Sequence, residues 1–281
     1  MSDNGARLIE LLDLEQVEVN IFRGVSLDEV RRRVFGGQVA AQALVAAGRT
    51  VEGRRVHSLH AYFLRPGDPH HPILYVVDRI RDGRSFTTRT VSGIQHGETI
   101  LSLSCSFHVD EEGLVHGDAI PEVPAPDRLV SVAEIARQRG EVPTNFANTY
   151  GLDVRFVSES PWTRKGPSDH ERLWFRASGE FGDDPIIHAA VVTFASDLTL
   201  VDTILQRHGM TPSDENFVGA SLDHCVWFHR PFRADQWLFY DQTSPVAFGA
   251  RGLARGLLFA EQGELVASVV QEGLVRLKKT P

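Results

Sequence analysis

Hydrophobic positions recur with two spacings along the chain, one typical of helices and one typical of strands. The helical and strand-like segments come in the same order in both halves. Apolar and polar residues alternate over residues 57–66, 73–80, 85–91 and 97–109, and again over residues 222–231, 237–244, 246–256 and 263–275. Alternation with period two is typical of strands that have one buried face. The turn dipeptides Asp82-Gly83, His96-Gly97 and Gln262-Gly263 indicate short hairpins. Each half is therefore predicted to end in a run of about four antiparallel strands.

Helical spacing precedes each run of strands. Small and apolar residues over residues 36–51 predict a helix that approaches a sheet closely. Residues 184–200 predict a second helix, with Pro185 in its first turn and Ile187, Val191 and Phe194 on a core-facing stripe. We also expect a short helix over residues 6–12, a strand over residues 17–22 and a short helix over residues 131–140.

The two halves share a sequence motif. Phe63-x-Arg65-Pro66 returns 165 positions later as Phe228-x-Arg230-Pro231, and Gly97-Glu98 returns 166 positions later as Gly263-Glu264. One helix on an antiparallel sheet, occurring twice, predicts an α+β tandem (double) hotdog, with two curved antiparallel sheets each wrapped on a long central helix. The predicted division is an N-terminal hotdog over residues 1–110, a linker rich in acidic residues and proline over residues 111–150, and a C-terminal hotdog over residues 151–281 that carries the catalytic residues.

Composition restricts the function further. The 281 residues carry a formal net charge of −8, which argues against nucleic acid and anionic membranes as partners. Cys105 and Cys225 lie in apolar alternating segments and are interpreted as small buried residues. The N-terminus lacks a signal-peptide pattern, and the longest uncharged run, residues 34–48, is too short to span a membrane. The C-terminus is not a peroxisomal address. We therefore expect a cytoplasmic protein without membrane insertion.

Six sequence blocks together resemble the acyl-CoA thioesterase II family (TesB type). In chain order they are FGGQVAAQAL, HSLHAYFLRPGDP, RDGRSFTTRTVSGIQ, FASD, SLDHCVWFHRPF and VVQEGLVR. The resemblance implies a double-hotdog hydrolase of fatty acid metabolism that cleaves acyl-CoA to a free fatty acid and coenzyme A without a cofactor. The family's aspartate falls on Asp197, its hydroxyl residue on Ser221, where threonine is common, and its glutamine on Gln271.

These residue types suit the implied chemistry. A thioester needs only an oriented water molecule that loses a proton as it attacks, and Asp197 is the expected base, with a pKa raised by partial burial. Ser221 and Gln271 would fix the water or stabilise the oxyanion. Backbone N–H groups at the start of the first helix, at Gly37 and Gln38, are expected to complete the oxyanion site. The expected walls of the acyl channel are Phe63, Trp227 and Phe228.

Each of these residues also has a structural interpretation. Asp197 could bind backbone N–H groups at a helix end, Ser221 could be a strand-start serine, and Gln271 could face outward. Asp223 and His224 are strand neighbours that point to opposite faces, so we expect structural roles for both. His70 and His71 lack partners at ligand spacing, so no metal site is predicted. The arginines that could meet coenzyme A phosphates, among which the sequence does not choose, are Arg65, Arg84, Arg89, Arg230, Arg251 and Arg255.

Two other functions remain open at this point. An enoyl-CoA hydratase would use a base and an acid around the double bond, commonly with histidine or glutamate. A hotdog protein could also bind acyl-CoA without turnover. Large sheet faces and the resemblance both lead us to expect a homo-oligomer.

Overall fold

The computed structural model describes residues 4–27, 33–139, 150–157, 166–179, 181–212, 214 and 216–278. The helices are α1 (Asn4–Leu12), α2 (Gly36–Gly48), the 3-10 turn η1 (Pro126–Arg128), α3 (Val132–Gln138), α5 (Pro185–Ser196) and α6 (Leu200–Gln206). Strands of the first half are β1 (Glu15–Glu18), β2 (Ile21–Gly24), β3 (Arg55–Phe63), β4 (Ile73–Asp82), β5 (Phe86–Gln95) and β6 (Glu98–His108). Those of the second half are β7 (Leu152–Phe156), β8 (His170–Ala177), β9 (Phe217–Ser221), β10 (Asp223–Phe228), β11 (Leu238–Phe248), β12 (Arg251–Ala260) and β13 (Leu265–Leu277).

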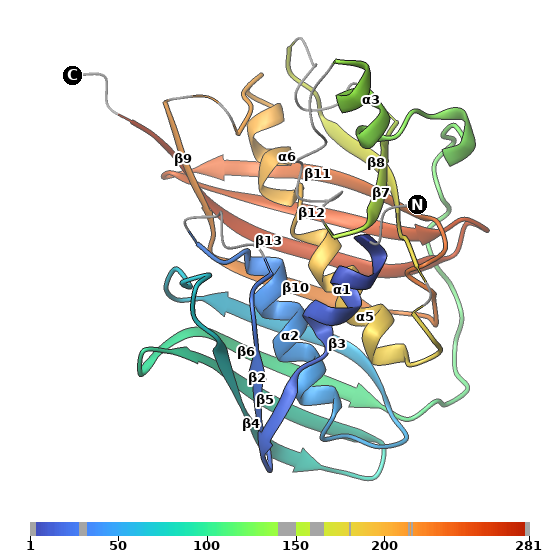
Figure 1. The fold of residues 1–281 in the computed structure, drawn as a ribbon. Coiled ribbons are helices and arrows are strands. Elements are labelled where there is room, and N and C mark those ends of the chain that lie inside the picture. Colours follow the sequence, from blue (N-terminus) through green and yellow to red (C-terminus); the bar gives the residue numbers. More distant parts are fainter. Residues whose placement is uncertain are drawn as a thin grey trace.

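The two predicted sheets are joined edge to edge. The strand order is β1-β2-β4-β5-β6-β3-β10-β13-β12-β11-β8-β7, and β9 also pairs with β13. The junction is the antiparallel pair β3–β10, in which Leu59 lies opposite Val226. Figure 1 shows the first half, blue to green, beside the second half, yellow to red. Pairing at this junction satisfies the backbone groups that would otherwise form an exposed edge in each half.

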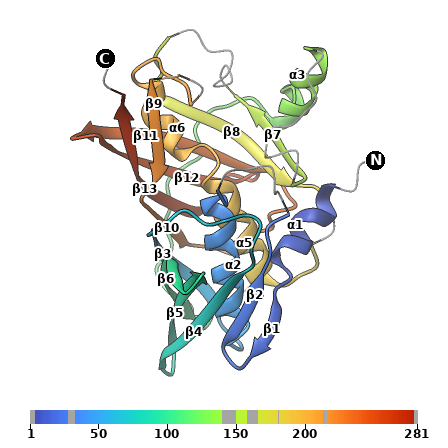
Figure 2. The same ribbon diagram turned by 60° about the vertical axis from the view of Figure 1, so that its left-hand side comes forward.

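Helices α2 and α5 lie side by side against the inner face of the sheet (Figure 2). A Cβ on Gly48 would lie 2.4 Å from the side chain of Ile186, and a Cβ on Gly37 would lie 2.7 Å from the carbonyl oxygen of Phe194. The glycines therefore permit a backbone approach that no other residue allows. Both helices are buried over nearly their whole surface, which explains why they are apolar all round.

Several element boundaries differ from the prediction. Helix α2 ends at Gly48 instead of residue 51, and α5 ends at Ser196 instead of residue 200. Asp197 follows as the C-terminal cap of α5, and α6 begins three residues later. The single strand expected over residues 17–22 is a hairpin of β1 and β2, because Asn20 adopts a left-handed conformation with φ of 63°.

The described part of the linker packs on the outer face of the second half. Ile120, Val123 and Leu129 contact a cluster formed by Trp174, Trp237, Phe239 and Phe259. The indole of Trp174 donates a hydrogen bond to the carbonyl oxygen of Pro124 at 3.0 Å. The linker thus covers apolar surface, and the expected short helix within it is α3, capped by Ser131. Residues 140–149 of the predicted linker lie outside the described residues.

The α5–α6 segment, Pro185–Gln206, is long and apolar enough to cross a membrane by length and composition alone. However, 72% of its most apolar window is buried within the protein. Its composition therefore reflects a position in the core.

Candidate active site

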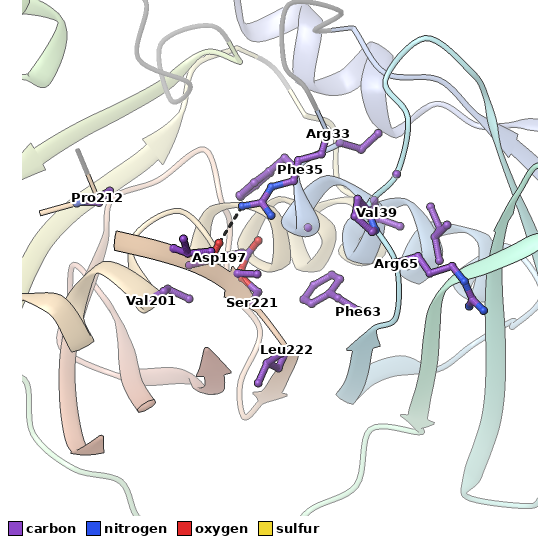
Figure 3. Close-up of a pocket in the computed structure, with 18 of the residues that line it drawn as sticks. Arg33, Phe35, Val39, Phe63, Arg65, Asp197, Val201, Pro212, Ser221 and Leu222 are labelled. Atoms are coloured by element: carbon purple, nitrogen blue, oxygen red, sulfur yellow. Dashed lines mark hydrogen bonds between the residues drawn. The ribbon is translucent and has the colours of Figure 1, made fainter. Parts of the chain in front are cut away.

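Asp197 lies where α5 ends, at the boundary between the two halves. One carboxylate oxygen, Oδ2, accepts a hydrogen bond from the backbone N–H of Gly37 in α2 at 2.7 Å. The other, Oδ1, accepts from the Ser221 hydroxyl at 3.2 Å and from the Gln271 amide nitrogen. The structure thus brings the three predicted catalytic side chains together. Figure 3 shows Asp197 beside Ser221 at the wall of a cavity.

Strand register places the two partners of Asp197. Ser221 ends β9 and lies opposite Gly273 of β13, two residues from Gln271. Buried and less buried positions alternate along this part of β13, and Gln271 belongs to the buried set. The outward-facing interpretation of Gln271 is therefore wrong. Glu272 points the other way, and its backbone N–H donates to the Asp223 carboxylate at 2.6 Å.

Buried hydrogen bonds fix the end of α5. The Ser196 hydroxyl and the His224 imidazole share a hydrogen bond of 2.9 Å, and the Tyr240 hydroxyl donates to the Ser196 carbonyl oxygen at 3.2 Å. Burial lowers the pKa of His224 to about 3, so its ring is neutral at physiological pH. His224 and Asp223 point to opposite faces, as expected for strand neighbours.

Burial controls the protonation of Asp197. The side chain is 7% exposed, and desolvation raises its pKa to about 6, although the hydrogen bonds from Gln271, Gly37 and Ser221 act in the opposite direction. The N-terminus of α2 also favours the carboxylate form, because its unpaired N–H groups and dipole attract negative charge. Asp197 is therefore ionised at neutral pH and remains basic enough to accept a proton.

The amide nitrogen of Gln271 bonds to Asp197, whereas its amide oxygen is available for a further hydrogen bond. Its amide nitrogen must face Asp197, because an ionised carboxylate only accepts hydrogen bonds. Its amide oxygen is buried, and no donor in the described part of the chain reaches it. This oxygen can accept a hydrogen bond from a water molecule or a substrate next to Asp197.

A cavity of about 820 Å³ opens beside Asp197. Residues from both halves line it, and its apolar side chains include Val34, Phe35, Val39, Phe63, Ile100, Val201 and Leu222. Arg33, Arg65 and Lys278 add positive charge to its wall, and Asp202 adds a second carboxyl group. Partial burial, together with the charges of Glu171 and Asp197, raises the pKa of Asp202 to about 8. The mixture of an apolar interior and basic residues suits a long ligand with an anionic end.

The five predicted substrate-binding residues separate into two groups. Phe63 lines the cavity, and Gly37 contacts Asp197 directly. The Gln38 side chain is turned toward Val25 and Ser26 instead. Trp227 packs edge-on against His60, and Phe228 lines a different cavity. Neither Trp227 nor Phe228 is among the described residues that line the cavity at Asp197.

The internal repeat explains why Phe63 and Phe228 are separated. β3 and β10 carry equivalent motifs, but they are neighbouring antiparallel strands. The C-terminal end of β3 therefore lies next to the start of β10, and the two C-terminal ends point in opposite directions. The end of β10 lines a second cavity of about 290 Å³. At the repeat offsets, Val56 corresponds to Ser221 and Cys105 to Gln271. The first half therefore has a valine and a cysteine where the second half has Ser221 and Gln271, so the second cavity lacks counterparts of these two polar side chains.

The six candidate arginines also separate. Arg84 is exposed in the turn between β4 and β5. Arg65 lines the main cavity and is paired with Glu98, whereas Arg230 lines the second cavity. Arg89 is buried and bonded to Asp82 and Thr50, so its role is structural. Arg251 is bonded to Glu272, and Arg255 to Thr243. Sequence reasoning missed Arg33 and Lys278, because neither lies in an alternating strand segment that leads into the site.

Comparisons with known proteins identify the family. A family model described as acyl-CoA thioesterase matches residues 143–274, and one described as acyl-CoA thioesterase N-terminal domain matches residues 26–108. The chain is 40% identical to "Acyl-CoA thioesterase 2" of Haemophilus influenzae, over 99% of this chain and 100% of that protein. The chain belongs to the acyl-CoA thioesterase family. Both the predicted family and the predicted enzyme class, a thioester hydrolase, are confirmed.

Two further matches agree with this assignment. The thioesterase is 37% identical to human "Acyl-coenzyme A thioesterase 8", over 95% of this chain and 88% of that protein. A crystal structure of an acyl-CoA thioesterase II from Mycobacterium marinum superposes with a TM-score of 0.81 at 44% identity, covering 97% and 99% of the two chains. The thioesterase fold is the predicted tandem hotdog.

Proposed function

We propose that Asp197, Ser221 and Gln271 of this acyl-CoA thioesterase hold and activate the water molecule that cleaves the thioester. The observation that carries this proposal is the convergence of the Ser221 hydroxyl and the Gln271 amide on one oxygen of a buried carboxylate beside a cavity. Such an arrangement fixes the orientation of the base before the substrate binds, which lowers the entropic cost of the reaction.

In the proposed reaction, water attacks the carbonyl carbon of the thioester while Asp197 takes one of its protons. The tetrahedral intermediate then collapses, the carbon–sulfur bond breaks, and the thiolate of coenzyme A leaves. The proton on Asp197 passes to that thiolate, which restores the carboxylate. The products are a free fatty acid and coenzyme A.

Ser221 and Gln271 have distinct parts in this scheme. Ser221 donates to Asp197 in the free enzyme and can turn its hydroxyl toward the attacking water. Gln271 donates to Asp197 and offers its unpaired amide oxygen to the same water. The N–H of Gly37 is committed to Asp197, so Gly37 positions the base rather than the oxyanion.

We propose that the acyl-CoA occupies the 820 Å³ cavity, with its acyl chain on the apolar walls and its phosphates near the basic rim. Arg33, Arg65 and Lys278 supply the positive charge for this contact. The cytoplasmic location, the homo-oligomer and the place in fatty acid metabolism stay predictions. Size-exclusion chromatography with light scattering measures the oligomeric state.

The test measures thiol release from short, medium and long acyl-CoA substrates. We expect Asp197→Asn to lower kcat by roughly 10²- to 10⁴-fold, the range for loss of a general base. Ser221→Ala should lower kcat by about 10- to 100-fold, whereas Ser221→Thr should retain most activity, because it keeps the hydroxyl. Asp118→Asn, at an exposed linker carboxylate, serves as the matched control.

Unchanged thiol release by a folded Asp197→Asn protein would remove Asp197 from the mechanism. Equal losses in Ser221→Ala and Ser221→Thr would show that the hydroxyl is not the group that matters.

A further inference from the structure

Asp68, His71 and His96 form a cluster at the surface. None of them is hydrogen-bonded to Asp197. Asp68 and His71 belong to the loop between β3 and β4, and His96 belongs to the turn between β5 and β6. The His71 Nδ1 atom lies 2.9 Å from the Asp68 Oδ2 atom, and the His96 Nε2 atom lies 3.8 Å from the same oxygen. One ligand atom from each residue can be chosen so that all lie within 4.8 Å of one another.

The backbone beneath these side chains is held in place by Gln95. Its side chain is buried, and its amide nitrogen donates to the carbonyl oxygens of Asp68 at 2.9 Å and His71 at 2.7 Å. Its amide oxygen accepts from the backbone N–H of Asp68 at 2.8 Å. Because Gln95 directly precedes His96, a single side chain ties the loop to the hairpin that carries the third residue. The three side chains themselves remain accessible.

The positions of the Asp68, His71 and His96 side chains suit the binding of a cation. The backbone N–H of His70 donates to the Asp68 Oδ1 atom at 2.9 Å, and the Asp68 Oδ2 atom faces the two imidazole rings. The rings of His71 and His96 lie 4.5 Å apart at an angle of 71°. His96 adopts a left-handed conformation with φ of 51°, at a turn position that asparagine or glycine usually occupies.

We propose that Asp68, His71 and His96 bind a transition-metal ion, with Zn²⁺ as the best match. Two imidazoles and one carboxylate are common protein ligands of zinc, and water can take the fourth tetrahedral position. Bond lengths of about 2.0–2.1 Å place tetrahedral zinc ligands roughly 3.3 Å apart. The observed separations of 2.9 and 3.8 Å lie on either side of that value, so small side-chain rotations close the site. His96 lies 25 residues from His71 on another hairpin, and this separation hid the cluster at the sequence level.

The segment that carries Asp68 also forms part of the wall of the main cavity. Residues 63–67 line that cavity and lead directly into Asp68. The Gly67 carbonyl oxygen accepts from the Val34 backbone N–H at 2.9 Å, and the Leu64 backbone N–H donates to Ile100 at the same distance. A bound ion would therefore fasten the loop to the β5–β6 turn and stiffen one side of the substrate cavity.

Isothermal titration of the metal-free full-length protein with Zn²⁺ at neutral pH tests the proposal. We expect one tight Zn²⁺ per chain and a rise in Tm on adding the ion. His96→Asn and Asp68→Asn should each weaken this binding by about tenfold or more, because each removes one of three protein ligands. His70→Asn is the matched control, since His70 is an exposed histidine next to the cluster that contributes only its backbone to it.

The metal-free Tm of each variant shows that it is folded. Zn²⁺ binding by the His71→Asn/His96→Asn double variant with wild-type affinity would overturn the proposal, as would the absence of a binding heat in the wild-type protein. Equal weakening in His70→Asn and His96→Asn would also overturn it.

Discussion

Burial and hydrogen bonding have opposite effects on the pKa of Asp197. Burial makes the carboxylate basic, and three hydrogen bonds hold it in one orientation, although each of them stabilises the anion. The balance leaves its pKa at about 6, between that of an exposed aspartate and neutrality. A base in this range is mostly ionised at pH 7 and still accepts a proton readily.

This balance predicts the pH dependence of the reaction. The base acts only when deprotonated, so kcat/KM should be low in acid, rise through an apparent pKa of about 6 and level off above it. Gln271→Ala removes a hydrogen bond that favours the anion, so the rising limb should shift to higher pH as kcat falls. Initial rates of thiol release across the pH range measure both effects. A limb centred near 4 in the wild type would contradict the raised pKa.

Sequence information located the three candidate catalytic residues but not all of their surroundings. The FASD, SLDHCVWFHR and VVQEGLVR blocks selected Asp197, Ser221 and Gln271, which the fold places in contact. Trp227 and Phe228 were selected from the same blocks and lie elsewhere. Both residues are close to Ser221 in the sequence, but this does not place them near it in the fold. They lie at the far end of β10, away from the candidate site.

Among the elements, α2 and α5 depend on each other most closely. Gly48→Ala would place a methyl group 2.4 Å from Ile186, so α2 and α5 would have to separate. We expect a loss of about 1–3 kcal/mol in the free energy of unfolding, the usual cost of overpacking. Chemical denaturation measures this loss. Gly113→Ala, where a Cβ meets nothing within 4 Å, is the control, and Ile186→Ala should partly rescue the variant. Additive effects of Gly48→Ala and Ile186→Ala would contradict the contact.

Periodicity predicted some elements and missed others for a physical reason. The strands β3–β6 and β10–β13 each present long stretches with one buried face, so alternation marks them. In β8, Leu173, Trp174 and Phe175 are all buried, because the linker covers the outer face at Trp174. Burial on both faces removes the alternation. The end of α5 at Ser196 was equally hidden, since apolar residues continue into α6.

At the scale of the whole molecule, the candidate active site is built from both halves. Gly37 comes from the first half, whereas Asp197, Ser221 and Gln271 come from the second. Residues 1–110 produced alone should aggregate, because β3 would expose an unpaired edge and α2 would lose its contact with α5. Sedimentation and thiol-release assays of the fragment check this. A soluble, monomeric and folded fragment would show that the β3–β10 junction is dispensable for the first half.

The hydrogen bond between Gly37 and Asp197 joins residues 160 positions apart, so it can form only after the repeats have docked. A chain still emerging from the ribosome contains the aspartate but lacks the environment that makes it reactive. If Asp197 is the base, as proposed, activity should appear only after the two halves have docked. On dilution from denaturant, the return of turnover should follow the slowest phase seen by tryptophan fluorescence rather than the early recovery of helix and sheet.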